Sequence, residues 1–299
     1  MELKGFHFDF VGRMRAFVII SILLTIGSLV IVQVKGLNYG IDFHGGVRLQ
    51  YRFSHEVNEA EVRKSVDSLG LSGFSVQKIG KPEEYRLLVN IGQDTNTEFA
   101  GKKITEALQK DIDPQASLDQ EISVGPKAGS ELRKKAILAV IVSWLLILIY
   151  IGFRFDFYFA PGAIIALIHD VLIALGAFAL TGREISLTVI AAFLTIVGYS
   201  INDTIVIYDR IRENIPEMTK LSLRELINLS INETFSRTII TSLTVFIVVV
   251  ILFLFGEGDI QNFGFAMMFG TISGAYSTVF VATPCYIFLK ESKLFNKAK

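Results

Sequence analysis

The sequence is poor in the residues that build covalent cross-links and metal sites. Its 299 residues include one cysteine, Cys285, and four histidines. A single cysteine forms no disulfide within the chain and leaves the redox compartment unspecified. Acidic and basic residues balance at 29 each, so net charge gives no argument for a nucleic-acid partner. A phosphate-loop glycine pattern and a serine-nucleophile motif are also missing. These absences predict a protein without a cofactor, a metal or an enzymatic activity.

Long apolar runs dominate the rest of the sequence. Hydrophobic residues make up 51% of the chain and the mean hydropathy is +0.49, which is too apolar for an ordinary soluble protein. Six runs can cross a bilayer as helices of roughly 17 to 25 residues: 16–34, 136–153, 158–181, 185–208, 238–255 and 263–289. No small-residue cleavage pattern follows the first run, so we expect an uncleaved membrane anchor and not a signal peptide.

Basic residues concentrate on one side of these six runs. Arg13 precedes the first run, Arg154 separates the second from the third, and Arg210 and Arg212 follow the fourth. The opposite loops carry few bases, and short cytoplasmic loops are the ones enriched in lysine and arginine. We therefore expect both termini in the cytoplasm and the long segment 35–134 outside.

The outer segment 35–134 combines strand and helix patterns. Apolar and polar residues alternate where strands are indicated, and apolar residues recur every three or four positions where helices are indicated. The expected order is strand, helix, strand, strand, helix, strand, at 47–53, 56–69, 74–79, 85–91, 97–112 and 118–124. This is the split βαβ order of a ferredoxin-like α+β domain. Asp111 and Asp113 are interpreted as surface charge, and the domain as a binding or docking module.

A further helix is expected between the fourth and fifth runs. Residues 222–234 carry apolar side chains along one side, which is typical of a helix on a membrane surface. The predicted fold class is a polytopic α-helical membrane protein with one extracytoplasmic domain. We divide it into a cytoplasmic amino terminus with span one (1–34), the outer domain (35–134), spans two to four (135–209), a cytoplasmic amphipathic connector (210–236), and spans five and six with a cytoplasmic carboxyl terminus (237–299).

A carboxylic acid lies inside the fourth apolar run. Asp203 follows Asn202 within 185–208, where a charge in hydrocarbon costs at least about 2.5 to 3.5 kcal/mol. Such a residue usually faces other helices and has a function. The alternative is a neutral acid that makes an interhelical hydrogen bond. Tyr199 and Thr204 complete the polar surroundings expected on this helix.

A second polar pair, His169 and Asp170, lies near the middle of the third run. Two ionisable groups at this depth are expected to avoid lipid. The sequence leaves open whether they bond to a neighbouring helix or relay protons. The other three histidines lie in the amino terminus or the outer domain, which argues against a metal site. Small residues in the last run, including Gly270, Ser273 and Gly274, are interpreted as contacts for close helix packing.

Four segments together resemble the SecF family of bacterial protein-export subunits. They are Gly40-Ile-Asp-Phe-His-Gly-Gly46, Val124-Gly-Pro-Lys127, Ala166-Leu-Ile-His-Asp-Val171 and the stretch from Gly198 to Asn214. These segments occur in the family's order and at its spacing, over nearly the whole chain. The resemblance implies half of a small transporter of the resistance-nodulation-division (RND) superfamily, with six spans, in the bacterial cytoplasmic (inner) membrane.

The resemblance also implies partners and roles for particular residues. Members of the family pair with SecD, a similar subunit with a larger outer domain, and assist the SecYEG translocon in exporting unfolded preproteins by use of the proton motive force. YajC is an additional expected partner. Asp203 and Arg237 match the family's proton pathway. Five polar residues are expected to support them: Asn202, Tyr199, Thr204, His169 and Asp170.

Asp203 and Arg237 have complementary physical properties. Burial in a helix bundle favours the neutral carboxyl group, whereas a nearby guanidinium favours the carboxylate, and this competition suits the loading and release of a proton. Arg237 keeps its own proton and supplies the counter-charge. Sodium is the alternative coupling ion. Two other functions stay open at this point: a half-transporter that exports a small molecule or lipid, and a structural scaffold of the translocon without ion flux.

Overall fold

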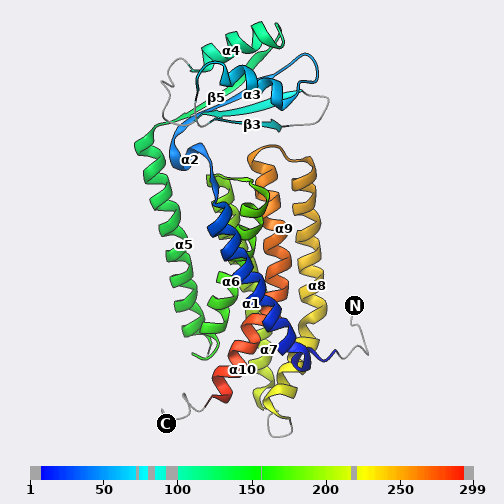
Figure 1. Ribbon diagram of the computed structural model, residues 1–299. Helices are drawn as coiled ribbons and strands as arrows, with labels where there is room; N and C mark the ends of the chain where they lie inside the picture. Colours follow the sequence, from blue (N-terminus) through cyan, green and yellow to red (C-terminus); the bar gives the residue numbers. More distant parts are fainter. Residues whose placement is uncertain are drawn as a thin grey trace.

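The computed structural model describes residues 8–71, 74–79, 85–91, 100–155, 157–216 and 221–292. It consists of a helix bundle with an α+β domain at one end (Figure 1). α1 (Phe10–Lys35) begins, and α10 (Thr283–Glu291) ends, at the end of the bundle that lies away from this domain. The two ends of the described chain therefore lie on the same side of the bundle.

Six helical segments of the described chain are long and apolar enough to cross a membrane, which confirms the predicted number. Four of them are single helices between α1 and the last span: α5 (Pro126–Arg154), α6 (Ala160–Thr181), α7 (Leu187–Asn214) and α8 (Leu223–Phe255). The last span, Asp259–Glu291, has three parts. These are α9 (Asp259–Ser277), a π-helical turn η4 (Thr278–Ala282) and α10.

α6, α7 and the last span form the centre of the bundle. In their most apolar stretches 56%, 44% and 67% of the residues are buried, against 6%, 11% and 17% in α1, α5 and α8. The three peripheral helices therefore expose wide apolar faces, which suit contact with lipid hydrocarbon. Polar residues of α6, α7 and α9 are consequently placed inside the bundle.

Glycines allow α7 and α9 to approach each other closely. A β-carbon at Gly270 of α9 would overlap the side chain of Ile196 of α7. A β-carbon at Gly274 would lie 3.1 Å from Ser200 of α7. The interpretation of small residues as packing contacts is confirmed for these two glycines.

The outer domain is a four-stranded antiparallel sheet with two helices on one face. The predicted element order is confirmed: β2 (Gly46–Arg52), α3 (Glu59–Asp67), β3 (Phe74–Ile79), β4 (Arg86–Ile91), α4 (Ala100–Asp111) and β5 (Ser117–Val124). The strands are arranged β3-β4-β2-β5, as in a ferredoxin-like fold. α3 and α4 cover the face that lies away from the bundle (Figure 1). The predicted helix residues 97–99 lie outside the described residues.

Two short strands connect this domain to the bundle. β1 (Asn38–Tyr39) follows α1 and pairs in parallel with β6 (Glu184–Ile185), which lies between α6 and α7. The short helix α2 (Ile41–His44) comes next and packs against α5. A β-carbon at Gly129 of α5 would lie 2.9 Å from the backbone nitrogen of Gly45, so glycine permits this contact.

The segment 222–234 departs from its predicted place. It is not a separate helix on the membrane surface, because α8 runs unbroken from Leu223 to Phe255. A reciprocal capping box between Ser222 and Glu225 begins the helix. Its apolar side packs in the bundle core, through Leu226, Ile227 and Ile231. The amphipathic pattern is thus a helix as predicted, but neighbouring helices cover its apolar side.

Asp113 also departs from its interpretation as surface charge. The residue is 2% exposed, and its carboxylate accepts hydrogen bonds from the backbone nitrogens of Ser54 and Gln115. The Ser54 hydroxyl donates a further bond at 2.9 Å. These donors offset the loss of hydration that a buried carboxylate suffers. Asp113 therefore holds two loops of the outer domain together.

Candidate functional site

Asp203 lies inside the bundle at the contact between α7 and α8. The apolar residues around it make α7 a spanning helix, and successive residues of a helix point about 100° apart. Asp203 is 2% exposed, and its Oδ2 accepts a hydrogen bond from Ser242 Oγ of α8 at 3.3 Å. This distance is long for a hydroxyl donor. The carboxyl group is therefore enclosed but only loosely held.

The two neighbours of Asp203 point in different directions. Asn202 lies on the exposed side of α7. Thr204 is buried, and its Oγ1 lies 3.1 Å from Thr278 Oγ1, at the start of η4. π-helical turns often occur at functional sites because they interrupt the regular bonding of a helix. The predicted polar triplet thus contacts α8 and η4 on its inner side and leaves an amide on its outer side.

Tyr199 and Arg237 complete the surroundings of Asp203. The Tyr199 hydroxyl is buried beside Ser242. Arg237 of α8 is exposed, and its charge acts on the Asp203 carboxyl group. Among the described residues, no ion pair within 4.0 Å joins Arg237 to Asp203. The structure therefore places the two predicted residues on adjacent helices without direct contact.

His169 and Asp170 form the centre of a second buried network, which joins α6 to α7 and α9. Asp170 is fully buried. Its carboxylate accepts bonds from Ser200 Oγ at 2.6 Å, Ser273 Oγ at 2.6 Å and Ser277 Oγ at 2.8 Å. His169 Nδ1 lies 3.0 Å from Asp170 Oδ1. Bonding of this pair to neighbouring helices is thus observed, and the proton-relay role stays a prediction.

The two buried carboxyl groups differ in how firmly they are held. A carboxylate has about four lone-pair sites for hydrogen bonds, and Asp170 has four polar neighbours from three helices at 2.6–3.0 Å. Asp203 accepts a bond from Ser242 at 3.3 Å, and the hydroxyl of Thr241 lies beside it, both on α8. Asp170 is therefore suited to holding helices in place. Asp203 keeps free hydrogen-bond acceptor sites, at which a proton or another partner can bind and leave.

Four serines of the site were not predicted as site residues from the sequence. Ser200, Ser242, Ser273 and Ser277 are buried and bond to one of the two carboxyl groups. A signal was present for two of them, because Ser273 and Ser277 are four residues apart and so lie on one side of a helix. Ser273 was interpreted only as a small packing residue.

Among the described residues, no three histidine, cysteine, aspartate or glutamate side chains are grouped so that they could hold a metal ion. The polar groups at hand are one loosely held carboxyl group, hydroxyls and a nearby guanidinium. Such a set can bind and release a proton or a small cation, and it offers no activated nucleophile.

Two segments of the chain match known family models. Residues 104–292 match the family described as protein export membrane protein SecD/SecF, C-terminal. Residues 34–57 match the SecD/SecF GG motif, which here includes Gly45 and Gly46 at the start of β2.

Individual relatives are similar over nearly their full length. The protein translocase subunit SecF of Calditerrivibrio nitroreducens is 41% identical over 289 residues, covering 95% of each chain. That of Magnetococcus marinus is 41% identical over 292 residues, covering 96% of this chain and 93% of its own.

A solved structure shares the fold. The crystal structure of SecDF from Thermus thermophilus superposes with a TM-score of 0.88 at 35% identity. The match covers 98% of this chain and 40% of that one. A crystal structure of SecDF in the super-membrane-facing form superposes with a TM-score of 0.74 at 36% identity. By these matches and by its six spans with one outer domain, the chain belongs to the SecD/SecF family of protein export membrane proteins, as a member of its SecF branch.

Proposed function

We propose that this multi-pass membrane protein pairs with SecD and uses the proton motive force to promote a late stage of preprotein export across the bacterial cytoplasmic membrane. In this proposal the chain assists the SecYEG translocon, with YajC as a further partner, and has no enzymatic activity of its own. Both termini lie in the cytoplasm, and the outer domain meets the unfolded preprotein. The observation that carries the proposal is the buried, loosely bonded Asp203 beside the charge of Arg237.

Asp203 is the proposed proton-binding group. Its neutral form suits the enclosed site, and its charged form gains from the Arg237 guanidinium on the adjacent helix. One proton that crosses the membrane releases about 2.3 kcal/mol per 100 mV. An energy of this size shifts an equilibrium between two helix arrangements by roughly 50-fold. That is enough to bias movement of α7 against α8.

The exposed side of α7 supports pairing with SecD. Ala191, Thr195, Gly198 and Asn202 are exposed at intervals of three or four residues and therefore lie along one side of the helix. An asparagine amide facing lipid has no hydrogen-bond partner there and costs free energy. Small residues beside it allow a second helix to approach closely. A partner bundle would cover this surface.

The alternatives are less well supported. The outer domain of about 90 residues is small for the porter domain that export of a small molecule or lipid would favour. That size favours the protein-export function over this alternative. A scaffold without ion flux has no need of a carboxyl group in hydrocarbon, because such a group is costly. Sodium stays an alternative coupling ion for the same carboxyl group.

The test is gradient-driven export by membrane vesicles that contain the chain with its partner subunit and the translocase. An imposed proton gradient should increase preprotein export by the parent protein and leave Asp203→Asn unaffected, because an amide cannot take up the proton. Asp209→Asn is the matched control, since Asp209 is also on α7 but pairs with Arg154 at a half-exposed position.

Each outcome decides between the functions. If Asp203→Asn responds to the gradient as the parent does, the scaffold function replaces the motor. If a sodium gradient alone drives export and a proton gradient alone does not, sodium is the coupling ion. If Asp209→Asn also loses the increase in export under a proton gradient, α7 tolerates no loss of charge. Asp203 would then have no specific role in proton binding.

A further inference from the structure

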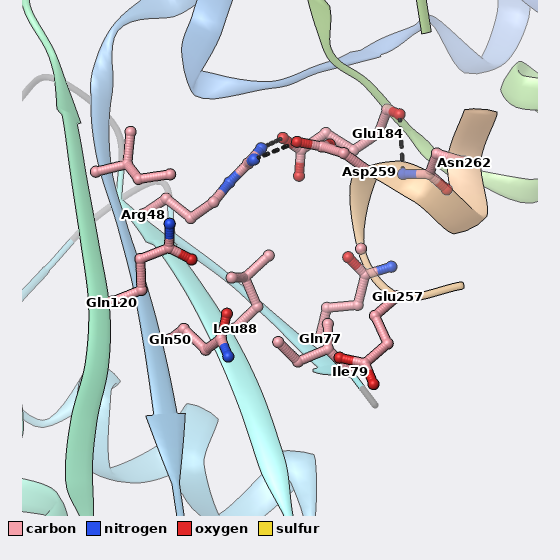
Figure 2. Close-up of a pocket in the computed structure, with 12 residues that line it drawn as sticks. Arg48, Gln50, Gln77, Ile79, Leu88, Gln120, Glu184, Glu257, Asp259 and Asn262 are labelled. Carbon is pink, nitrogen blue, oxygen red and sulfur yellow. Dashed lines mark hydrogen bonds and ion pairs between the residues drawn. The ribbon is translucent and has the colours of Figure 1, made fainter. Parts of the chain in front are cut away.

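Arg48 fastens the outer domain to the bundle. It lies in the middle of β2, where Val47 and Leu49 point into the domain core, so that alternation directs Arg48 to the bundle-facing side of the sheet. Its guanidinium bonds to Glu184 and, at 2.9 Å, to Asp259 (Figure 2). The planar guanidinium has donors on two sides and can hold two carboxylates at once.

Glu184 lies in β6, in the connection that leads into the outer end of α7. It lies three residues before Leu187, the first residue of that helix. Its Oε2 accepts a bond from Asn90 Nδ2 of β4 at 2.7 Å. The backbone nitrogen of Leu187 donates to Asp42 Oδ2 at 2.9 Å. The helix that carries Asp203 is therefore held to the outer domain at its very beginning.

Asp259 belongs to the outer end of α9. It is the first residue of that helix, in whose continuation Ser273 and Ser277 contact Asp170. Asn262, one turn later, donates to the backbone oxygen of Glu184 at 3.3 Å. α7 and α9 thus meet at Arg48 on the outside and at the Asp170 network inside the bundle.

Packing between the sheet and the ends of α7 and α9 is interrupted beside Arg48. Beside Arg48 a cavity of about 230 Å³ separates the sheet from the helix ends, with Gln50, Gln77 and Leu88 on one side and Glu257 on the other (Figure 2). Continuous packing is therefore interrupted there. A second ion pair, Arg86 to Glu257 at 3.1 Å, crosses the same gap. Ion pairs act over short distances when they are hydrogen bonded, so relative movement of α7 and α9 must change the contacts of Arg48.

Burial makes the Arg48 contacts costly to break. The Arg48 and Glu184 side chains are 11% and 8% exposed. Burial raises the pKa of Glu184, and the guanidinium of Arg48 opposes this rise. Loss of one partner would leave a buried charge without compensation, which is more costly than the loss of an exposed pair. Asp259, with 33% exposure, is the less enclosed of the two carboxylates.

We propose that Arg48 is the positioning residue that transmits movement of α7 relative to α9 to the outer domain, and so couples proton movement to preprotein export. The inference rests on the proposed function, since it takes Asp203 as the proton-binding group. Arg48 does not bind the proton. It joins the helix that does so, and its neighbour α9, to the sheet that faces the preprotein.

The experiment measures export and proton movement in the same vesicles, which contain the full chain with its partner subunit and the translocase. In Arg48→Met, gradient-driven export should fall by about tenfold, the effect of losing one strong charge-assisted contact, while proton movement reported by an internal pH dye continues. Export by Arg48→Lys should lie between that of the parent and that of Arg48→Met, because an ammonium cannot hold both carboxylates in the planar geometry.

Arg52→Met is the matched control. Arg52 lies on the same strand and pairs at 2.9 Å with Asp119 within the domain, and among the described residues it makes no ion pair or hydrogen bond with the bundle. It should keep both export and proton movement. If Arg48→Met fails to accumulate, Asp259→Asn tests the same contact at its more exposed carboxylate, with export reduced and proton movement kept.

The outcomes separate the inference from the function on which it rests. Loss of proton movement together with export in the Arg48 and Asp259 variants would overturn the inference, since Arg48 would then only support the folded bundle. Unchanged export in both variants would overturn it as well. Failure of the parent to respond to a gradient, or a normal response of Asp203→Asn, would instead contradict the proposed function.

Discussion

Ser200 of α7 donates a hydrogen bond of 2.6 Å to Asp170 of α6. Ser200 precedes Asp203 by three residues, which is less than one helical turn. The bond therefore limits rotation of α7 about its own axis and keeps Asp203 turned toward α8. One buried carboxyl group positions the other, although they belong to different helices.

The first prediction concerns this bond. Ser200→Ala should destabilise the protein by about 0.6 kcal/mol, the average for hydrogen bonds between membrane helices, and by no more than about 1.7 kcal/mol, the largest value. Unfolding of the purified protein in detergent measures the change. Thr271→Val is the control, because the Thr271 hydroxyl is buried without a hydrogen-bond partner among the described residues. Equal losses in the two variants would mean that removal of any buried hydroxyl has this effect, and that the Asp170 bond contributes nothing of its own.

The second prediction concerns how Arg237 acts on Asp203. Because no ion pair within 4.0 Å joins them in the described chain, the charge of Arg237 should matter and its planar shape should not. Arg237→Lys should therefore keep most gradient-driven export, whereas Arg237→Gln should lose it. Export by vesicles under an imposed proton gradient measures both. A lysine variant as inactive as the glutamine variant would indicate a direct, geometry-dependent contact during the cycle.

Local patterns were sufficient to predict most of the fold. The six spans follow from apolar runs, and the ferredoxin-like element order follows from alternation and helical spacing between Val47 and Val124. These patterns report which side of an element is apolar. They do not report what covers that side, which is why 222–234 was placed on the membrane surface although Leu226 and Ile231 pack inside the bundle.

Residue types at the site were predictable, but their partners were not. An aspartate in an apolar run is conspicuous in any sequence, so Asp203 and Asp170 could be singled out. The serines that bond to Asp170 come from two other helices, up to 107 positions away. Serine is also common as a small packing residue in membrane helices. Only the tertiary arrangement distinguishes the two uses of Ser273 and Ser277.

Contacts between the outer domain and the bundle were the least predictable. Arg48 and Glu184 are 136 positions apart. In the sequence, each looks like an ordinary exposed polar residue of its segment. Asp113 shows the same limit on a smaller scale, because its partner Ser54 is 59 positions away. Charged residues are exposed by default, and sequence alone gives no reason to depart from that default.

The third prediction concerns Gly46, at the start of β2. Its φ of 135° is unusual for residues with a β-carbon, and a β-carbon there would overlap the backbone oxygen of Ile91. Gly46→Ala should therefore destabilise the outer domain by more than the about 1 to 3 kcal/mol that backbone strain alone costs. Gly70→Ala is the control, because Gly70 has a φ of 70° and open space around it. Thermal unfolding measured on both variants should show the larger loss for Gly46→Ala, and equal losses would mean that the Ile91 overlap is relieved.

The last prediction concerns the pH dependence of the contact between Glu184 and the outer domain. Burial raises the pKa of Glu184 above its ordinary 4.5, while Arg48 lowers it and the charges of Asp259 and Asp42 raise it further. A carboxyl group with a raised pKa binds more protons in the folded protein than in the unfolded chain, so its contribution to stability is complete below 4.5 and is lost as the pH rises through the raised value.

The stabilising contribution of Glu184 to the parent protein should accordingly decrease as the pH increases from 4.5 toward neutrality. Glu184→Gln should remove this part of the pH dependence of the free energy of unfolding, because an amide does not titrate. Thermal unfolding across this pH range measures the difference between parent and variant. Glu106→Gln is the control, since Glu106 is exposed on α4 and its replacement should leave the slope unchanged. If the Glu184 variant keeps the parent's slope, Glu184 stays paired and ionised throughout, and the ion pair with Arg48 outweighs the cost of burial.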